Sequence, residues 1–184
     1  MSSRLGALLR VYDRHPGAPR PGEQLWRGGV TDRATRGIST EHGPHWLTMR
    51  DFPVDAPPAD SATAEKPVKD WLLEQIVPGD AASPEHAGGI ALVAMSVPPE
   101  ADDEFNDWYT TEHIPLLSQV PGMILPRRFK ARSGPTGYLA LYYVNDIAIY
   151  GTPAWTSANE TPWMLRMRRF QFDRTYFLFC EREA

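Results

Sequence analysis

Two segments with apolar side chains on both faces constrain the fold of this 184-residue chain most strongly. Residues 89–97 and 137–144 carry apolar residues at both parities of the alternating strand pattern. A strand can bury both of its faces only when it is covered from both sides, so we expect each segment to lie in a sheet between two packed layers. The length allows one ordinary domain or two small repeated units with a shared core.

The residues that follow the first of these strands predict a helix with a break. Pro98 and Pro99 end the strand, and three acidic residues at positions 102–104 place negative charge where a helix N-terminus favours it. One stripe of this helix is apolar apart from a carboxylate: Phe105, Tyr109, Glu112, Leu116 and Val120, with Trp108 and His113 beside it. Pro115 has no amide proton to donate, so we expect a kink just after Glu112 and His113.

The strand expected at residues 123–131 carries two arginines of different character. Arg127 falls on the apolar parity and Arg128 on the polar one. A carboxylate on an apolar helix face beside an arginine on an apolar strand face has two interpretations. Glu112 and Arg127 form a structural ion pair, since a lone buried charge is costly. Alternatively they line a pocket, in which Arg127 meets an anionic or enolate-like oxygen and Glu112 or His113 moves a proton.

The remaining segments predict further strands and helices around this core. We expect strands at residues 5–12, 45–54 and 175–181, and a helix at residues 67–76, PVKDWLLEQI. Thr161 and Pro162 begin a second helix, PWMLRMRRF. Residues 77–87 read as a linker, and residues 13–40 stay ambiguous, with a short helix near Trp26 interrupted by Gly28 and Gly29.

The two halves of the chain resemble one another. GPHWLTM at Gly43 matches GPTGYLAL at Gly134, and the two helical segments align so that Trp71 falls on Trp163. Each half then reads strand, helix, strand, strand, helix, strand, which is the ferredoxin-like βαββαβ unit. The fold class is therefore predicted as α+β, with two tandem ferredoxin-like repeats forming a fused α/β barrel. Residues 1–80 form a degenerate N-terminal repeat, and residues 88–184 form the repeat that carries the site, in one compact unit.

The segment EFNDWYTTEHIPLLSQVPGMILPRRF, residues 104–129, resembles the dimeric α/β-barrel superfamily in its EthD-like branch. There a WY-x-x-EH-x-P helix precedes a VPG turn and an arginine-containing strand. That superfamily includes muconolactone isomerases, cofactor-free quinone-forming monooxygenases, polyketide cyclases and haem-binding peroxidases, so the resemblance implies a fold and a pocket rather than one reaction.

The resemblance also implies which side chains act. Family members use a His or Tyr between helix and sheet as acid or base, which here points to His113 and Tyr109, with Glu112 orienting His113. Residues 16–37 contain no such motif, so we expect one site per chain. The side chains that we expect to bind the substrate, a small hydrophobic or aromatic molecule, are Arg127, Trp108, Phe105, Tyr142 and Trp163.

Composition argues against several classes of function. A net charge of −4 gives no electrostatic footprint for nucleic acid, and no apolar run is long enough to cross a membrane, so we expect a cytoplasmic protein. The single cysteine, Cys180, lies in an apolar run typical of a buried thiol. Glu41, His42 and His45 lack a second ligand cluster, so no metal site is expected. The sequence contains no phosphate-binding loop motif, so no nucleotide cofactor is expected.

Three functional hypotheses follow. The first is a cofactor-independent enzyme, of isomerase, cyclase, dehydratase or decarboxylase type, that moves protons on an aromatic or enolisable substrate. The second is a cofactor-free or haem-linked monooxygenase of aromatic compounds. The third is a non-catalytic small-molecule-binding accessory protein. Because the duplication can supply the sheet-to-sheet contact within one chain, a monomer and a homodimer are both compatible with the sequence.

Overall fold

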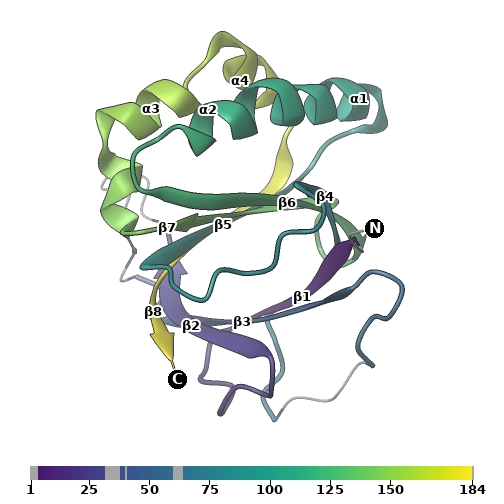
Figure 1. The fold of residues 1–184 in the computed structure, drawn as a ribbon, viewed down its shortest axis with the longest axis vertical. Coiled ribbons are helices and arrows are strands. Elements are labelled where there is room, and N and C mark those ends of the chain that lie inside the picture. Colours follow the sequence, from purple (N-terminus) through teal and green to yellow (C-terminus); the bar gives the residue numbers. More distant parts are fainter. Residues whose placement is uncertain (1–3, 32–37, 40, 60–63, 184) are drawn as a thin grey trace.

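The computed structural model describes residues 4–31, 38–39, 41–59 and 64–183, and eight strands in these ranges close into a barrel (Figure 1). The strands are β1 (Leu5–Tyr12), β2 (Glu23–Val30), β3 (His45–Pro53), β4 (Lys69–Val77), β5 (Gly89–Ser96), β6 (Met123–Ser133), β7 (Tyr138–Val144) and β8 (Phe172–Glu183).

All neighbouring strands pair antiparallel, in the order β1-β3-β2-β8-β5-β7-β6-β4. Each half contributes four strands with its last strand beside its first, as in the ferredoxin-like unit: β4-β1-β3-β2 and β8-β5-β7-β6. The seams between β2 and β8 and between β4 and β6 close the barrel within one chain. The fused α/β barrel is thus confirmed, whereas the division at residues 80–88 stays a prediction.

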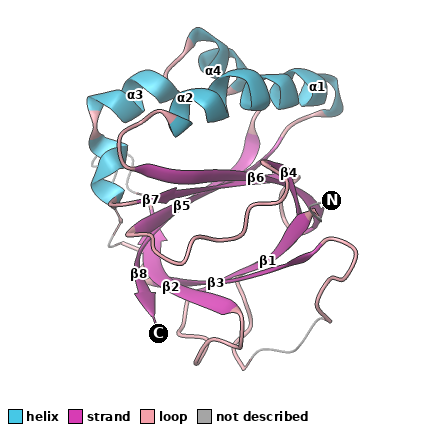
Figure 2. Cartoon of the chain, in the orientation of Figure 1, coloured by secondary structure: helices cyan, strands magenta, loops and turns pink. Residues whose placement is uncertain are grey.

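The helices of the described residues form a single layer outside the barrel, over the sheet of the C-terminal half (Figures 1 and 2). They are α1 (Pro99–Trp108), a π-helical turn η1 (Tyr109–His113), α2 (Ile114–Ser118), a 3-10 turn η2 (Ile147–Gly151), α3 (Pro153–Asn159) and α4 (Pro162–Met167). None of the described helices has the length and apolarity needed to span a membrane.

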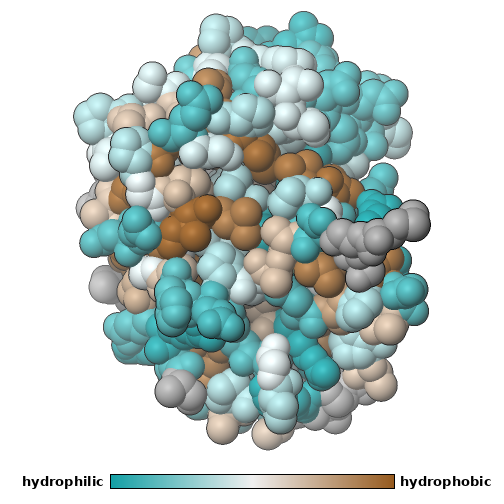
Figure 3. Space-filling view, in the orientation of Figure 1, coloured by the Kyte–Doolittle hydropathy of each residue, from teal (hydrophilic) through white to brown (hydrophobic). Residues whose placement is uncertain are grey.

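Two hydrophobic cores explain the strands that are apolar on both faces. One core fills the barrel with side chains from both halves, such as Leu9, Trp71 and Phe179. The other lies between the helical layer and the outer face of β5, β7 and β8. All seven residues of β7 are buried, because alternate side chains enter alternate cores. On one surface of the molecule, apolar side chains gather in a band below the helical layer (Figure 3).

The helix expected at residues 67–76 is wrong, because this segment is strand β4. Trp71, Leu73 and Gln75 alternate inward along it, and Trp71 pairs with Leu9 of β1. A helical stripe of Val68, Trp71, Leu72 and Ile76 fits the same segment almost as well, so local pattern alone does not choose between the two. Pairing with β1 on one side and β6 on the other decides for the strand.

The ambiguous region around Trp26 is also a strand, β2, and its glycines mark the barrel seam. The register with β8 shifts between Arg27 and Gly28. A Cβ atom on Gly28 would lie 1.9 Å from the carbonyl oxygen of Leu178, so the two backbones can approach this closely only at glycine. The glycines that interrupt a helical pattern here thus allow the close pairing of β2 with β8 that joins the two halves.

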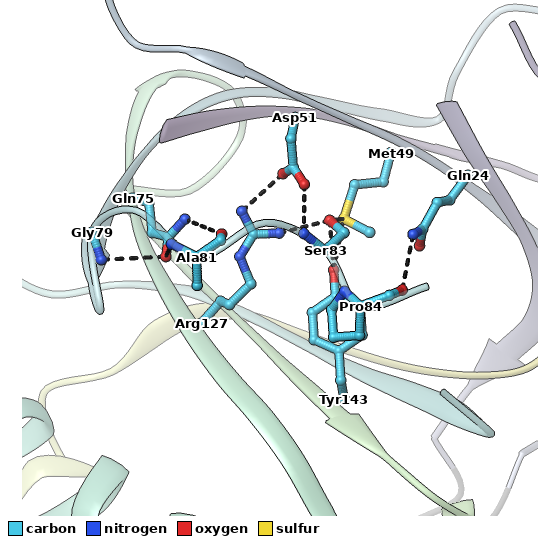
Figure 4. A network of polar contacts seen from close by, with 10 residues as sticks. All are labelled: Gln24, Met49, Asp51, Gln75, Gly79, Ala81, Ser83, Pro84, Arg127 and Tyr143. Atoms are coloured by element: carbon cyan, nitrogen blue, oxygen red, sulfur yellow. Dashed lines mark hydrogen bonds and ion pairs between the residues drawn. The ribbon is translucent and has the colours of Figure 1, made fainter. Parts of the chain in front are cut away.

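A buried arginine fastens the connection between the two halves (Figure 4). Arg127 of β6 is fully buried, and its Nη2 donates to Asp51 Oδ1 of β3 at 2.8 Å. Its Nη1 donates to Ser83 Oγ of the connecting segment at 2.7 Å. The Ser83 amide in turn donates to Asp51 Oδ2 at 2.6 Å, and the Tyr143 hydroxyl of β7 donates to Ser83 Oγ at 3.2 Å. One guanidinium thereby ties strands of both halves to the connecting segment.

Replacing Asp51 by Ala is expected to lower the free energy of unfolding by about 3 kcal/mol, because the guanidinium of Arg127 stays buried without its carboxylate. Urea denaturation measures the loss. Glu181→Gln is the control, since it removes an ion pair with Arg27 in which both side chains are exposed and should change stability little. Similar losses in the two variants would contradict the structural role given to Arg127.

Candidate functional site

A cavity of about 630 Å³ opens between the helical layer and the sheet. Residues of β5 and β8 line one side of it, and the helical wall carries aromatic side chains. The aromatic and imidazole groups that line it are Trp108, Tyr109, His113, Tyr142, Tyr150, Trp155, Tyr176 and Phe177. The size and the aromatic lining suit a small flat molecule.

A π-helical turn places His113 in this wall. Between α1 and α2 the helix widens over Tyr109–His113, and the Ile114 amide donates to the Tyr109 carbonyl five residues earlier. Pro115, which has no amide proton, follows directly. The expected break after Glu112 and His113 is therefore a change of helical period, and such turns recur at functional sites. It points both Tyr109 and His113 inward.

Three aromatic neighbours fix the imidazole of His113. Its Nε2 lies 3.1 Å from the Tyr142 hydroxyl of β7, and the donor of this hydrogen bond depends on the histidine tautomer. The ring centroid lies 4.4 Å from that of Trp108 and 4.9 Å from that of Tyr109. His113 is 4% exposed, so water solvates it little.

Burial sets the protonation states of this pair. It lowers the pKa of His113 from 6.5 to about 3, and the positive charges of Arg128 and Arg168 add to this effect. Burial also raises the pKa of Tyr142 well above its usual value of 10.0. At neutral pH the pair therefore consists of a neutral imidazole and a protonated phenol.

A second buried arginine supplies positive charge behind the wall. The guanidinium carbon of Arg128 lies 4.2 Å from the ring centroid of Tyr109, 4.7 Å from that of Tyr138 and 5.0 Å from that of Phe105. Its Nε and Nη2 have no hydrogen-bond partner, and it makes no salt bridge with another described residue. Such a caged cation projects positive potential and favours negative charge nearby. The strand pattern placed Arg128 on the polar face, but the helical layer covers that face.

Glu112 does not orient His113 in the way that the sequence suggested. Its Oε1 accepts hydrogen bonds from Trp108 Nε1 at 3.1 Å and from Thr161 Oγ1 at 2.5 Å. The carboxylate therefore fixes the indole that packs on His113 and joins α1 and η1 to the start of α4. Arg127 lies on the opposite face of β6, inside the barrel, so neither the expected ion pair with Glu112 nor a position in this cavity is found.

The other expected site residues divide into two groups. Trp108, Tyr109, His113 and Tyr142 come together in the cavity wall. Phe105 and Trp163 do not line it: Phe105 packs below Trp108 and Tyr109, and Trp163 donates from its Nε1 to Glu104 Oε1 at 3.2 Å. Trp163 therefore joins α4 to α1 outside the cavity.

The sequence analysis missed Tyr150, Trp155 and Arg168 as cavity residues. Trp155 lies on α3, a helix that the sequence pattern did not predict. A signal was present, because Thr152 and Pro153 begin α3 as Thr161 and Pro162 begin α4, with the threonine hydroxyl accepting from an amide three residues later. The short length of α3 hid its apolar period.

The site residues do not fit a haem iron. The Nε2 atom of His113 faces the Tyr142 hydroxyl, and its ring lies against Trp108 and Tyr109, so that nitrogen is not presented as an axial ligand. Within the described ranges, no three His, Cys, Asp or Glu side chains gather as metal ligands would. The described groups of the cavity wall that can exchange protons include the imidazole of His113 and the phenols of Tyr109, Tyr142, Tyr150 and Tyr176.

Comparisons with known proteins identify the fold. No protein-family model matches the sequence, and a search of curated proteins found no match. Among solved structures, a proposed monooxygenase from Lactobacillus acidophilus has a TM-score of 0.57 at 13% identity, over 99% of this chain and 95% of its own. An uncharacterized ferredoxin-fold protein related to antibiotic biosynthesis monooxygenases, from Listeria monocytogenes, has a TM-score of 0.55 at 10% identity, over 97% of this chain and 96% of its own.

A third similar structure is a major regulator of staphylococcal pathogenesis, with a TM-score of 0.53 at 8% identity over 95% of this chain and 97% of its own. All three structures share the ferredoxin-type barrel with this protein over nearly the whole chain. At these identities the likeness defines the class of fold, a fused ferredoxin-fold α/β barrel, and no activity.

The low pKa of His113 makes stability depend on pH. The unfolded state takes up a proton near pH 6.5 and the folded state only near pH 3, so the contribution of His113 is present above pH 6.5 and lost as pH falls toward 3. Between pH 7 and pH 5 this costs the wild type about 2 kcal/mol. Chemical denaturation at the two pH values measures the free energy of unfolding. Its decrease from pH 7 to pH 5 should be smaller in His113→Gln than in the wild type by this amount. Equal drops in the two proteins would contradict a buried neutral imidazole.

Removing the positive charge of Arg128 should raise the pKa of His113, because that charge disfavours the imidazolium. NMR titration of the His113 ring in Arg128→Met measures the change. Lys130→Met is the control, since Lys130 lies on the same strand and is exposed, with its Nζ 5.7 Å from the ring centroid of Tyr138. An unchanged His113 pKa in Arg128→Met would show that this guanidinium does not act on the site.

Proposed function

We propose that the cavity binds a flat aromatic or enolisable molecule and that His113 removes a proton from it without a cofactor. The observation that carries this proposal is the neutral imidazole of His113, hydrogen-bonded to Tyr142 in the wall of an aromatic cavity. A neutral imidazole can accept a proton, and the phenol beside it can donate a hydrogen bond to a developing oxyanion.

Positive charge near the cavity stabilises the ligand anion that proton removal by His113 would form. The proton moves to the imidazole, and the electron pair stays on the ligand as an enolate or phenolate. An imidazole whose pKa is about 3 is a weak base alone, but negative charge forming beside it stabilises the imidazolium. The guanidinium of Arg128, 4.2 Å from the Tyr109 ring, lowers the energy of the same anion. Return of the proton at a different atom would complete an isomerisation or a cyclisation.

A second candidate is cofactor-free oxygenation, favoured by the likeness to proteins described as monooxygenases or related to them. It begins with the same deprotonation. The carbanion then gives electrons to O2, a carbon–oxygen bond forms, and loss of water leaves a ketone. We also propose that the chain belongs to the EthD-like branch, that residues 88–184 form the repeat with the site, and that residues 1–80 form a degenerate N-terminal repeat.

Anthrone, a flat three-ring ketone with exchangeable hydrogens at C10, tests both candidates. Without oxygen and in D2O, the protein should speed deuterium incorporation at C10, as followed by NMR, and His113→Gln should lower that rate by about a hundredfold. Under air, stoichiometric O2 consumption with formation of anthraquinone and water would select the oxygenase. Exchange without O2 consumption beyond the protein-free rate would select proton transfer alone.

Trp163→Phe is the matched control, because Trp163 lies on the adjoining helix outside the cavity and should leave exchange near the wild-type rate. Saturable binding of anthrone with no acceleration of exchange, in both wild type and His113→Gln, would overturn the catalytic proposal and leave the non-catalytic binding protein.

A further inference from the structure

The side chains that line the cavity include more cations than anions. Arg168, Arg174 and Lys69 line it, against one carboxylate, Glu160, among the described lining residues. This excess of cations stands in a protein whose net charge is −4. The two arginines belong to one short stretch of the chain, at the end of α4 and early in β8, and both line the cavity. A local reversal of the overall charge indicates a preference for an anion there.

These two arginines have no carboxylate partner in the described part of the chain. The salt bridges found there include Arg166 with Glu104, at 2.9 Å, but none with Arg168 or Arg174. Arg168 is nevertheless half-buried, and its charge contributes to the low pKa of His113. A half-buried guanidinium near an apolar cavity is stabilised when an oxyanion joins it, and its planar fork suits carboxylates and phosphates.

An unsatisfied amide lies between them in sequence and lines the same cavity. The Oε1 atom of Gln171 is buried and has no hydrogen-bond partner. Most buried polar atoms in proteins are paired, so an orphan acceptor at the edge of a cavity indicates a place for a donor from a ligand or from water. Polar groups that converge at one end of an aromatic cavity are the usual way in which a pocket fixes the orientation of its ligand.

We propose that Arg168 and Arg174 form a subsite for an oxyanion, either carboxylate or phosphate, on an aromatic ligand whose rings fill the cavity, and that Gln171 Oε1 accepts a hydrogen bond from water or from a donor group of the same ligand. This proposal rests on the proposed function in that it takes the cavity to be the ligand site, and it narrows the ligand to an aromatic anion. An oxyanion at Arg168 would also offset part of the positive charge that disfavours protonation of His113, so that the ligand itself makes the imidazole a better base.

Isothermal titration calorimetry with three probes tests the subsite. 2-Naphthoate and 2-naphthyl phosphate carry the two oxyanions, and 2-naphthamide is neutral with the same rings. The wild type should bind at least one of the two anions about tenfold more tightly than the amide. Arg168→Gln should lose that preference while binding the amide as before. Arg169→Gln, a neighbouring exposed arginine that does not line the cavity, should keep it. The anion preferred by the wild type identifies the carboxylate or the phosphate.

Salt gives an independent readout on the wild type alone. Raising NaCl should weaken binding of the preferred anion and leave the amide unaffected. Equal affinity for the amide and both anions, or a preference that survives in Arg168→Gln, would overturn the subsite while leaving the aromatic cavity intact. Failure of all three probes to bind would overturn the cavity as the ligand site, and with it the proposed function.

Discussion

The barrel depends on one desolvated guanidinium. Arg127 is fully buried and reaches Asp51 of the N-terminal half and Ser83 of the connecting segment at once. A buried charge without partners is costly, so the two halves and the segment between them must meet at this point for any of them to be stable. The segment is held further by Gln75, which bonds the Ala81 carbonyl, and by Gln24, which bonds the Pro84 carbonyl (Figure 4). Arg127 therefore has a structural role, and the polar chemistry of the cavity lies on the other face of the sheet.

The helical layer covers only the sheet of the C-terminal half, and this asymmetry positions the site. Four strands without described helices complete the barrel, while the helices over β5, β7 and β8 leave a cavity beneath them. The π-helical turn at Tyr109–His113 directs two functional groups inward from consecutive turns of one helix. Glu112 accepts hydrogen bonds from both Trp108 and Thr161 and so holds the indole of Trp108 against His113. The inward positions of Tyr109 and His113 thus follow from one irregular turn.

Much of this arrangement could be predicted from the sequence, where buried faces leave a distinct pattern of apolar residues. Strands β5 and β7, the break near Pro115 and the inward direction of Tyr109 and His113 are of this kind. Strand β4 could not be separated from a helix, because Trp71 and Gln75 face inward in both periods, and only long-range pairing decides. The partner of Arg127 was missed for the same reason, since Asp51 is 76 residues away and no local rule joins the two.

The misassigned arginines show where a strand pattern fails. Parity distinguishes the two faces of β6 but not which layer covers each face. Arg128 was placed on the polar parity, yet it is 1% exposed and its guanidinium packs against Phe105, Tyr109 and Tyr138. A helix packed on the polar parity converts a surface cation into a buried one. The positive field behind His113 is thus a property of the tertiary structure, and it makes the cavity suited to anions.

A crystal structure of the protein soaked with 2-naphthoate would show directly where an aromatic anion binds. We expect the rings between Trp108 and Trp155, on the outer face of the sheet, with a ligand atom in contact with His113 or Tyr142. Ligand bound inside the barrel near Arg127, or in the small hollow beside Arg27 and Cys180, would contradict this expectation.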